Sequence, residues 1–445
     1  MMTSHPQSQP PLFPNASAPP ASPALPPAGR AWSVARRTRS ASTLPDAPPL
    51  DTGFELGWDH AHHGVVPSAA HLHPASPVHQ GWAAGCHTFG RRTLAADRFV
   101  RKWLLLRLNA WQRGRVFEGT RVNPSFLRRI DVATCPITGE TLSHGTGTLS
   151  DASVDRVCND AGYAAGNLAV MSARANRAKN DHGPADAMAF VGRIEAGELA
   201  GGLVGEAPDA ADAAREIAGL GAAHWARIAV LASFATPLPH AQAATLPLLV
   251  LPPPRLAVVN PVQALQVMLS LQFLRSGHSR RCAALASLMP DADARSAFRV
   301  FMFTLLARHL AAGKTGGRCA GLDAERRAIE VRWLDPLVQR RWQRLSLRLG
   351  AADCERIGRI AAARGLAGPG VQWLSDEAAT EGWALASRGY VTAEPAAAEP
   401  ATSVSGPSPA PIQTLSIDRS NASRSPCPGP MPSPCAAALA CDTMP

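Results

Sequence analysis

The chain has 445 residues, and its 44 Lys and Arg against 34 Asp and Glu give a formal net charge of +10. Its nine cysteines occur singly, without a CxxC pair, which argues against a disulfide framework or a zinc ribbon. No basic segment followed by an apolar core opens the sequence, and no apolar stretch reaches about eighteen residues. We therefore expect a cytoplasmic protein that does not enter membranes.

Nearly all of the positive charge is arginine, because the lysines are only Lys102, Lys179 and Lys314. A planar guanidinium can hold two phosphate oxygens at once, so this composition fits an anionic polymer as partner. A genome-wide bias toward arginine is the alternative explanation. Charge alone does not decide between the two.

Both ends of the chain have a composition typical of disorder. Residues 1–88 and 391–445 are rich in Pro, Ser and Ala, and they offer few large apolar side chains to offset the entropy of ordering. We predict that both segments are long disordered tails.

The first predicted element of the folded part is an amphipathic helix. Between residues 94 and 112, apolar residues recur at helical spacing. The opposite face is basic and carries Arg98, Arg101, Lys102, Arg107 and Arg113. Such a face is a solvated surface by default, and contact with phosphate is the alternative.

The order strand, loop, strand, helix is predicted for residues 153–179. The apolar residues that belong to the two strands are Val154, Val157, Leu168 and Val170. Glycines supply the turn conformations that the loop between them needs. A short polar helix then begins at Ser172 or Ala173 and runs through Lys179.

The rest of the folded part is predicted to be helical. An Ala- and Gly-rich segment ends in a proline-rich stretch, which can continue neither a helix nor a central strand. In the bundle that follows, Asn260 caps one helix, Asp291 or Asp293 begins a second, and Pro336 breaks a third. The predicted fold is mostly α with a small ββα module, divided as 1–88, 89–185, 186–258, 259–390 and 391–445.

Four short motifs occur in order between Cys135 and Asp181. They are Cys-Pro-x-Thr-Gly from 135, Ser-Val-Asp-Arg-Val from 153, Gly-Tyr-x-x-Gly-Asn-Leu from 162 and Ala-Asn-Arg-Ala-Lys-Asn-Asp from 175. Together they resemble the motifs of phage and bacterial HNH endonucleases, over about a tenth of the chain. The resemblance implies an HNH-like ββα fold for this segment and hydrolysis of DNA phosphodiester bonds.

The resemblance also implies a metal site. It makes Asp155 and Asn176 ligands of one divalent ion, Mg²⁺, Mn²⁺ or Ni²⁺, and it makes Asn167 the residue that ties the loop by side-chain hydrogen bonds. Many relatives pin the hairpin with two CxxC pairs, whereas only Cys135 and Cys158 lie near it here. We therefore expect no structural zinc and expect apolar packing to hold the hairpin.

One position departs from the family pattern. Arg156 stands where the general base is expected, and arginine cannot accept a proton near neutral pH. Either another residue supplies the base, with His144 and His182 as candidates, or the module binds without cutting. In an active enzyme Arg156 would stabilise charge in the transition state, and in a binding module it would clamp a phosphate.

The charge near the motifs fits a nucleic-acid partner, DNA first and RNA second. Residues 95–182 carry 13 Lys and Arg against 8 Asp and Glu, and the residues expected to follow a phosphate backbone are Arg174, Arg177 and Lys179. Three functions are open: a metal-dependent DNA endonuclease, a non-catalytic nucleic-acid-binding protein that keeps the ββα frame, and a helical interaction protein acting through residues 260–349. The set Asp155, Asn167 and Asn176 favours the first, and Arg156 favours the second.

Overall fold

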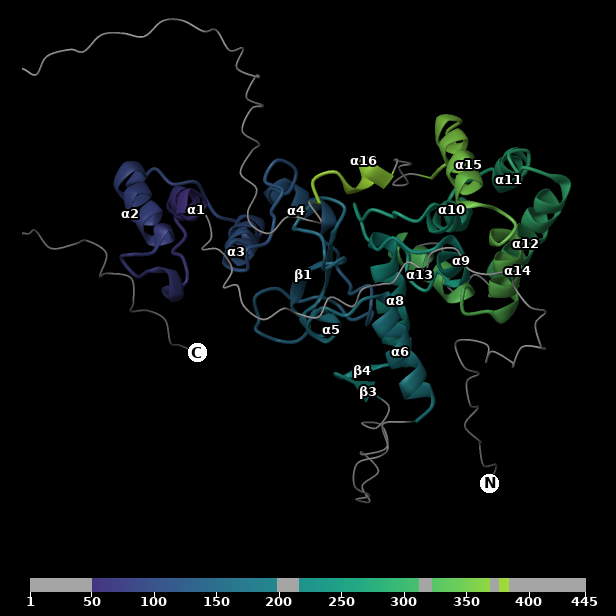
Figure 1. The fold of residues 1–445 in the computed structure, drawn as a ribbon, viewed down its shortest axis with the longest axis horizontal. Coiled ribbons are helices and arrows are strands. Elements are labelled where there is room, and N and C mark those ends of the chain that lie inside the picture. Colours follow the sequence, from purple (N-terminus) through teal and green to yellow (C-terminus); the bar gives the residue numbers. More distant parts are fainter. Residues whose placement is uncertain (1–49, 198–215, 312–321, 369–375, 384–445) are drawn as a thin grey trace, which may run out of the picture. The chain divides into compact units, whose positions relative to one another are not determined.

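The structure is a computed structural model in which residues 50–197, 216–311, 322–368 and 376–383 are described (Figure 1). Within these residues the chain is mostly helical, which confirms this part of the predicted fold class, and it has two two-stranded sheets, one more than predicted. None of the helices in these ranges combines the length and apolar character needed to span a membrane. Residues 391–445 of the predicted C-terminal tail lie outside the described residues, as do residues 1–49.

The first two helices pack as a hairpin inside the segment predicted to be disordered. They are α1 (Leu50–His62) and α2 (Pro77–Phe89), with a short 3-10 helix η1 (Ala69–His71) between them. The prediction for 1–88 is therefore wrong for this part. The helices need few large side chains because they meet through glycines: a Cβ on Gly57 would lie 1.9 Å from the Val78 carbonyl oxygen, and one on Gly81 would lie 1.9 Å from that of Phe54.

The predicted amphipathic helix is present as α3 (Arg98–Gln112), and α4 (Pro124–Ile130) follows it. Asp97 caps α3 by accepting hydrogen bonds from two amides of its first turn. Part of the basic face is neutralised inside the protein, because Arg98 pairs with Asp131 and Arg107 pairs with Asp59 of α1. The number of basic residues on this face is therefore larger than the number of positive charges left to contact a partner.

The predicted order strand, loop, strand, helix is confirmed by β1 (Ala152–Arg156), β2 (Leu168–Ser172) and α5 (Ala173–Lys179). The strands are antiparallel, and Val154 lies opposite Val170. Every residue of β2 is buried, so apolar packing holds the hairpin, as expected. Ser172 caps α5 with its Oγ, which accepts a hydrogen bond from the amide of Ala175 at 3.3 Å.

Between this module and the proline-rich stretch lie α6 (Pro184–Glu195), the short strands β3 (Glu216–Ile217) and β4 (Leu220–Gly221), and α8 (Ala222–Ala235). The later helices are α9 (His240–Thr245), α10 (Pro261–Ser270), η3 (Leu271–Leu274), α11 (His278–Ala286), α12 (Ala292–Ala311), α13 (Leu322–Arg332), α14 (Pro336–Ser346), α15 (Ala351–Ala363) and α16 (Asp376–Thr380). The three predicted helix boundaries are confirmed. α10 begins after Asn260, and Asp291 caps α12 by accepting a hydrogen bond from the Ala294 amide at 2.7 Å. The predicted third helix is broken at Pro336, where α14 begins.

One hydrophobic core joins the ββα module to the later helices. Its buried members run along the chain from Leu106 to Trp383, and all described residues belong to one compact unit. Arg227 of α8 crosses between the two parts: its Nε donates to the Pro136 carbonyl at 2.8 Å, and its guanidinium pairs with Glu330 of α13 at 2.8 Å. The predicted divisions at 185 and 258 therefore do not separate independent cores.

Replacing Gly57 or Gly81 by alanine should destabilise the hairpin, since the added methyl group would overlap a backbone oxygen. Overpacking costs about 1–3 kcal/mol, which is more than the ~1 kcal/mol gained by replacing a helical glycine. Amide hydrogen exchange in residues 50–89 should become faster when followed by mass spectrometry. Gly192→Ala in α6 is the matched control, because a Cβ there meets nothing within 4 Å. Equal exchange in all three variants would contradict the close approach of the helices.

Candidate functional site

An ion pair lies at the centre of the ββα module. Asp155 is on β1, and its side chain is 6% exposed, whereas that of Lys179 at the end of α5 is 0% exposed. The Lys179 Nζ lies 3.0 Å from the Asp155 Oδ2 and donates to the Arg156 carbonyl oxygen at 3.1 Å. At this distance the two side chains form an ion pair. The pair connects the first strand to the helix.

The electrostatics of this pair are set by burial. Desolvation raises the pKa of Asp155, and the neighbouring Lys179 ammonium opposes that rise. A carboxylate in such a place needs a positive partner, and Lys179 supplies it.

The two residues expected to bind a metal have close protein partners in this structure. The Lys179 ammonium lies beside one oxygen of the Asp155 carboxylate, 3.0 Å from Oδ2. The amide nitrogen of Asn176 donates to the Ser153 Oγ at 2.7 Å, so this side chain is held within the module. Within the described ranges, no group of three or more His, Cys, Asp or Glu side chains could hold an ion. The hydrogen bond of Asn176 uses its amide nitrogen and not its oxygen, so the ligand roles of Asp155 and Asn176 stay predictions.

Arg156 turns toward its own loop. Its Nη1 donates to the carbonyl oxygens of Asn159 and Ala161, both at 2.9 Å, and its guanidinium lies 5.1 Å from the ring centroid of Tyr163. These contacts use the guanidinium to hold main-chain carbonyls that would otherwise lack partners. In this structure Arg156 holds its own loop through Nη1, and the expected roles as phosphate clamp or transition-state group stay predictions.

Asn167 also holds this loop. Its side chain is buried: Oδ1 accepts from the Cys158 amide at 2.8 Å, and Nδ2 donates to the carbonyl oxygens of Cys158 and Gly162 at 2.9 and 3.0 Å. This is the loop-tying role that the resemblance implied, and it leaves Asn167 out of contact with any substrate.

The two candidate bases lie elsewhere. His144 is exposed in the loop before β1, and Asp151 closes that loop by accepting from Ser143 and Thr146, hydrogen bonds that lower the pKa of Asp151 to about 2. The ring of His182 packs edge-on against aromatic rings of α6 and α8, at 4.9 Å from Phe190. Asp155 contacts Lys179 rather than either histidine.

The three residues expected to follow a nucleic-acid backbone divide into two groups. Lys179 is buried together with Ala175 and Ala178 on the inward face of α5, so its side chain is not exposed to a phosphate backbone. Arg174 and Arg177 lie on the other side of α5 and are exposed. Within the described residues neither forms an ion pair, so both are available to a partner.

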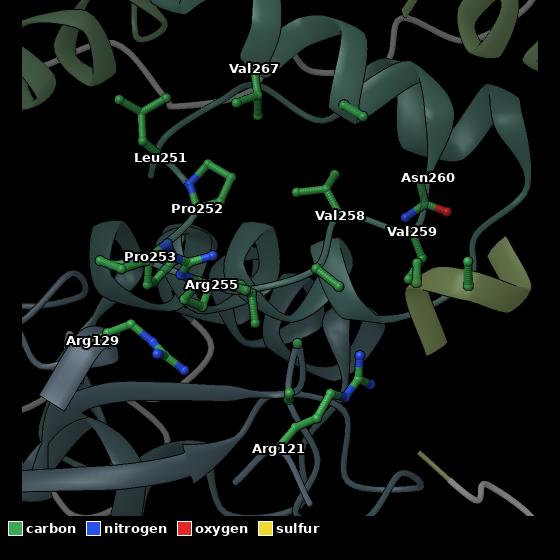
Figure 2. A pocket seen from close by; sticks show the side chains of 18 of the residues that line it. Arg121, Arg129, Leu251, Pro252, Pro253, Arg255, Val258, Val259, Asn260 and Val267 are labelled. Carbon is green, nitrogen blue, oxygen red and sulfur yellow. The ribbon is translucent and has the colours of Figure 1, made fainter. Parts of the chain in front are cut away.

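Sequence reasoning missed a pocket of about 1110 Å³ between the module and the later helices. Figure 2 shows Arg121 and Arg129 at its module side and Arg255 on the proline-rich segment that lines it. Arg326 of α13 also lines the pocket. The stretch around Arg255 was predicted as a linker, and its one local signal was an arginine directly after three prolines.

Comparisons with models of protein families, with curated proteins and with solved structures found no match to this chain. The HNH-like resemblance therefore stays an expectation that rests on the four motifs.

Breaking the buried pair should destabilise the fold. Asp155→Asn or Lys179→Met should each lower the free energy of unfolding by about 3–5 kcal/mol, because each leaves one buried charge unpaired. The double variant should lose less than the sum of the single losses, since it leaves neither charge behind. Urea unfolding of the four proteins measures this coupling, and additive losses would contradict the ion pair.

Proposed function

We propose that this chain is a nucleic-acid-binding protein whose ββα module keeps its frame without acting as a nuclease. The observation that carries the proposal is the split of the motif residues into two sets. Asp155, Arg156 and Lys179 are engaged inside the module. Arg174 and Arg177 are exposed on its helix.

The position of the two arginines supports contact with a phosphate backbone. They are three residues apart on α5, so they lie on one face of the helix, and the buried Ala175 and Ala178 fix the opposite face against the hairpin. Guanidinium groups on a fixed helix can each hold a phosphate with two hydrogen bonds. DNA is the polymer to test first, and RNA is the second.

Binding should weaken with salt, and α5 should contribute to that dependence. On duplex DNA, log affinity should fall with log salt by roughly 0.9 for each phosphate contact. Arg174→Gln and Arg177→Gln should each reduce this slope by about one contact in a fluorescence titration of the full chain. Arg280→Gln is the control, because Arg280 is an exposed arginine on α11, away from the module. A flat salt response would remove nucleic acid as the partner.

Cleavage, which the resemblance implied, is the competing prediction. A nicking assay on supercoiled plasmid with Mg²⁺, Mn²⁺ or Ni²⁺ should show no cutting where the full chain binds the plasmid, because Asp155 is committed to Lys179. Asp155→Asn serves as the control for contaminating activity. Metal-dependent nicking that this substitution abolishes, in a variant that still folds and binds, would overturn the non-catalytic proposal.

A further inference from the structure

The pocket between the module and the later helices has walls from distant parts of the chain. On one side lie Arg121 and Arg129, with Gly166 of the motif loop, and on another lies the segment that carries Arg255 (Figure 2). α10 contributes apolar side chains such as Val267. The segment is fixed to the module, since the Ala257 amide donates to the Gly166 carbonyl at 2.9 Å. The pocket therefore lies between segments that are held together by a hydrogen bond and by the common hydrophobic core.

Its positive charge is only partly neutralised. Arg121 pairs with Glu118, and Glu355, which also lines the pocket, lies 3.7 Å from Arg359. Arg129 and Arg255 are both exposed, and neither forms an ion pair within the described ranges. The lining thus holds four arginines against one carboxylate, that of Glu355, and this excess of positive charge favours an anionic ligand.

The backbone at Arg255 gives a second, independent observation. Its φ is +65°, a left-handed conformation that glycine and asparagine adopt far more readily than arginine. The residue lies in a tight turn in which the Leu256 amide donates to the Pro253 carbonyl at 3.2 Å. Arg255 thus keeps an unfavourable backbone conformation, and its side chain forms no ion pair in the described part of the chain. Such a residue is expected to serve binding more than folding.

We infer that this pocket binds a segment of single-stranded nucleic acid, an inference that rests on the proposed nucleic-acid-binding function and adds a second site to it. The guanidinium groups can hold phosphates, and the apolar lining residues that keep accessible surface, Pro254 and Val258, offer a wall against which bases can pack. The volume of about 1110 Å³ exceeds the ~300–1,000 Å³ of most small-molecule sites. An unpaired strand can turn its bases toward such walls, whereas the bases of a duplex are paired and stacked inside it.

The test compares two probes on the full chain by fluorescence anisotropy: a labelled oligothymidine of about twelve nucleotides, within the usual site sizes of single-strand binders, and a duplex of equal length. The variant Arg129→Gln with Arg255→Gly should weaken oligothymidine binding by at least about tenfold, since it removes two charged contacts. Duplex binding should change by less than about twofold. Arg280→Gln is again the control and should change neither.

Thermal unfolding separates binding from folding at Arg255. Arg255→Gly relieves the left-handed φ, so its midpoint should be equal to or higher than that of the parent chain. If the midpoint falls instead, Arg255 stabilises the fold. Oligothymidine binding by the single variant Arg129→Gln then decides the inference: weaker binding supports it, and unchanged binding contradicts it.

Two further outcomes would overturn the inference. One is unchanged oligothymidine binding in the pocket variants. The proposed function is then still decided separately, by the binding of the α5 variants to duplex DNA. The other is displacement of the probe by an oligoglutamate of equal charge as effectively as by unlabelled oligothymidine, which would assign the pocket to acidic polypeptides.

Discussion

Two opposite charges lie side by side inside the ββα module, and the cost of burying them constrains the residues around them. Lys179 exposes none of its side chain, and Asp155 exposes almost none. A buried ion pair is tolerated only when its geometry is close and its remaining donors have partners, and Lys179 meets this condition by donating to the Arg156 carbonyl. Because the pair joins β1 to α5, the helix cannot shift on the strand without leaving a charge unpaired. The same contact that fixes the helix also holds the Asp155 carboxylate inside the module.

The loop between the strands connects the module to the rest of the protein. The Trp383 indole donates to the Ala165 carbonyl, and the Gly162 amide donates to the Trp383 carbonyl, both at 3.0 Å. Gly166 has a φ of +91°, and a Cβ on it would lie 3.2 Å from that of Ala257, so this position needs glycine for its conformation as well as for the close approach. The motif loop is thus also the surface that the later segments around Ala257 and Trp383 contact.

Local signals were sufficient to predict the ββα order and the break at Pro336, because alternating or helical apolar spacing and proline act over a few residues. The α1–α2 hairpin escaped prediction because its helices meet through glycines such as Gly57, which carry no apolar signal. The inward position of Lys179 could have been predicted, since it is four residues after the small Ala175 and lies on the same helical face. That its partner is Asp155 depends on how the helix crosses the strand, which sequence spacing does not reveal. The pocket depends on the same kind of long-range contact.

Arginine serves two different purposes in this chain, and this limits what a net charge of +10 can say about function. Arg156 and Arg227 donate to main-chain carbonyls, so their charges are used to satisfy buried acceptors. Arg174, Arg177 and Arg255 are exposed and form no ion pair within the described residues. A guanidinium can join two segments because its five donors form a rigid fork, and an arginine-rich protein can therefore be strongly basic without a basic surface of matching size. The arginines that we propose as contacts for an anionic polymer are those on one face of α5 and around one pocket.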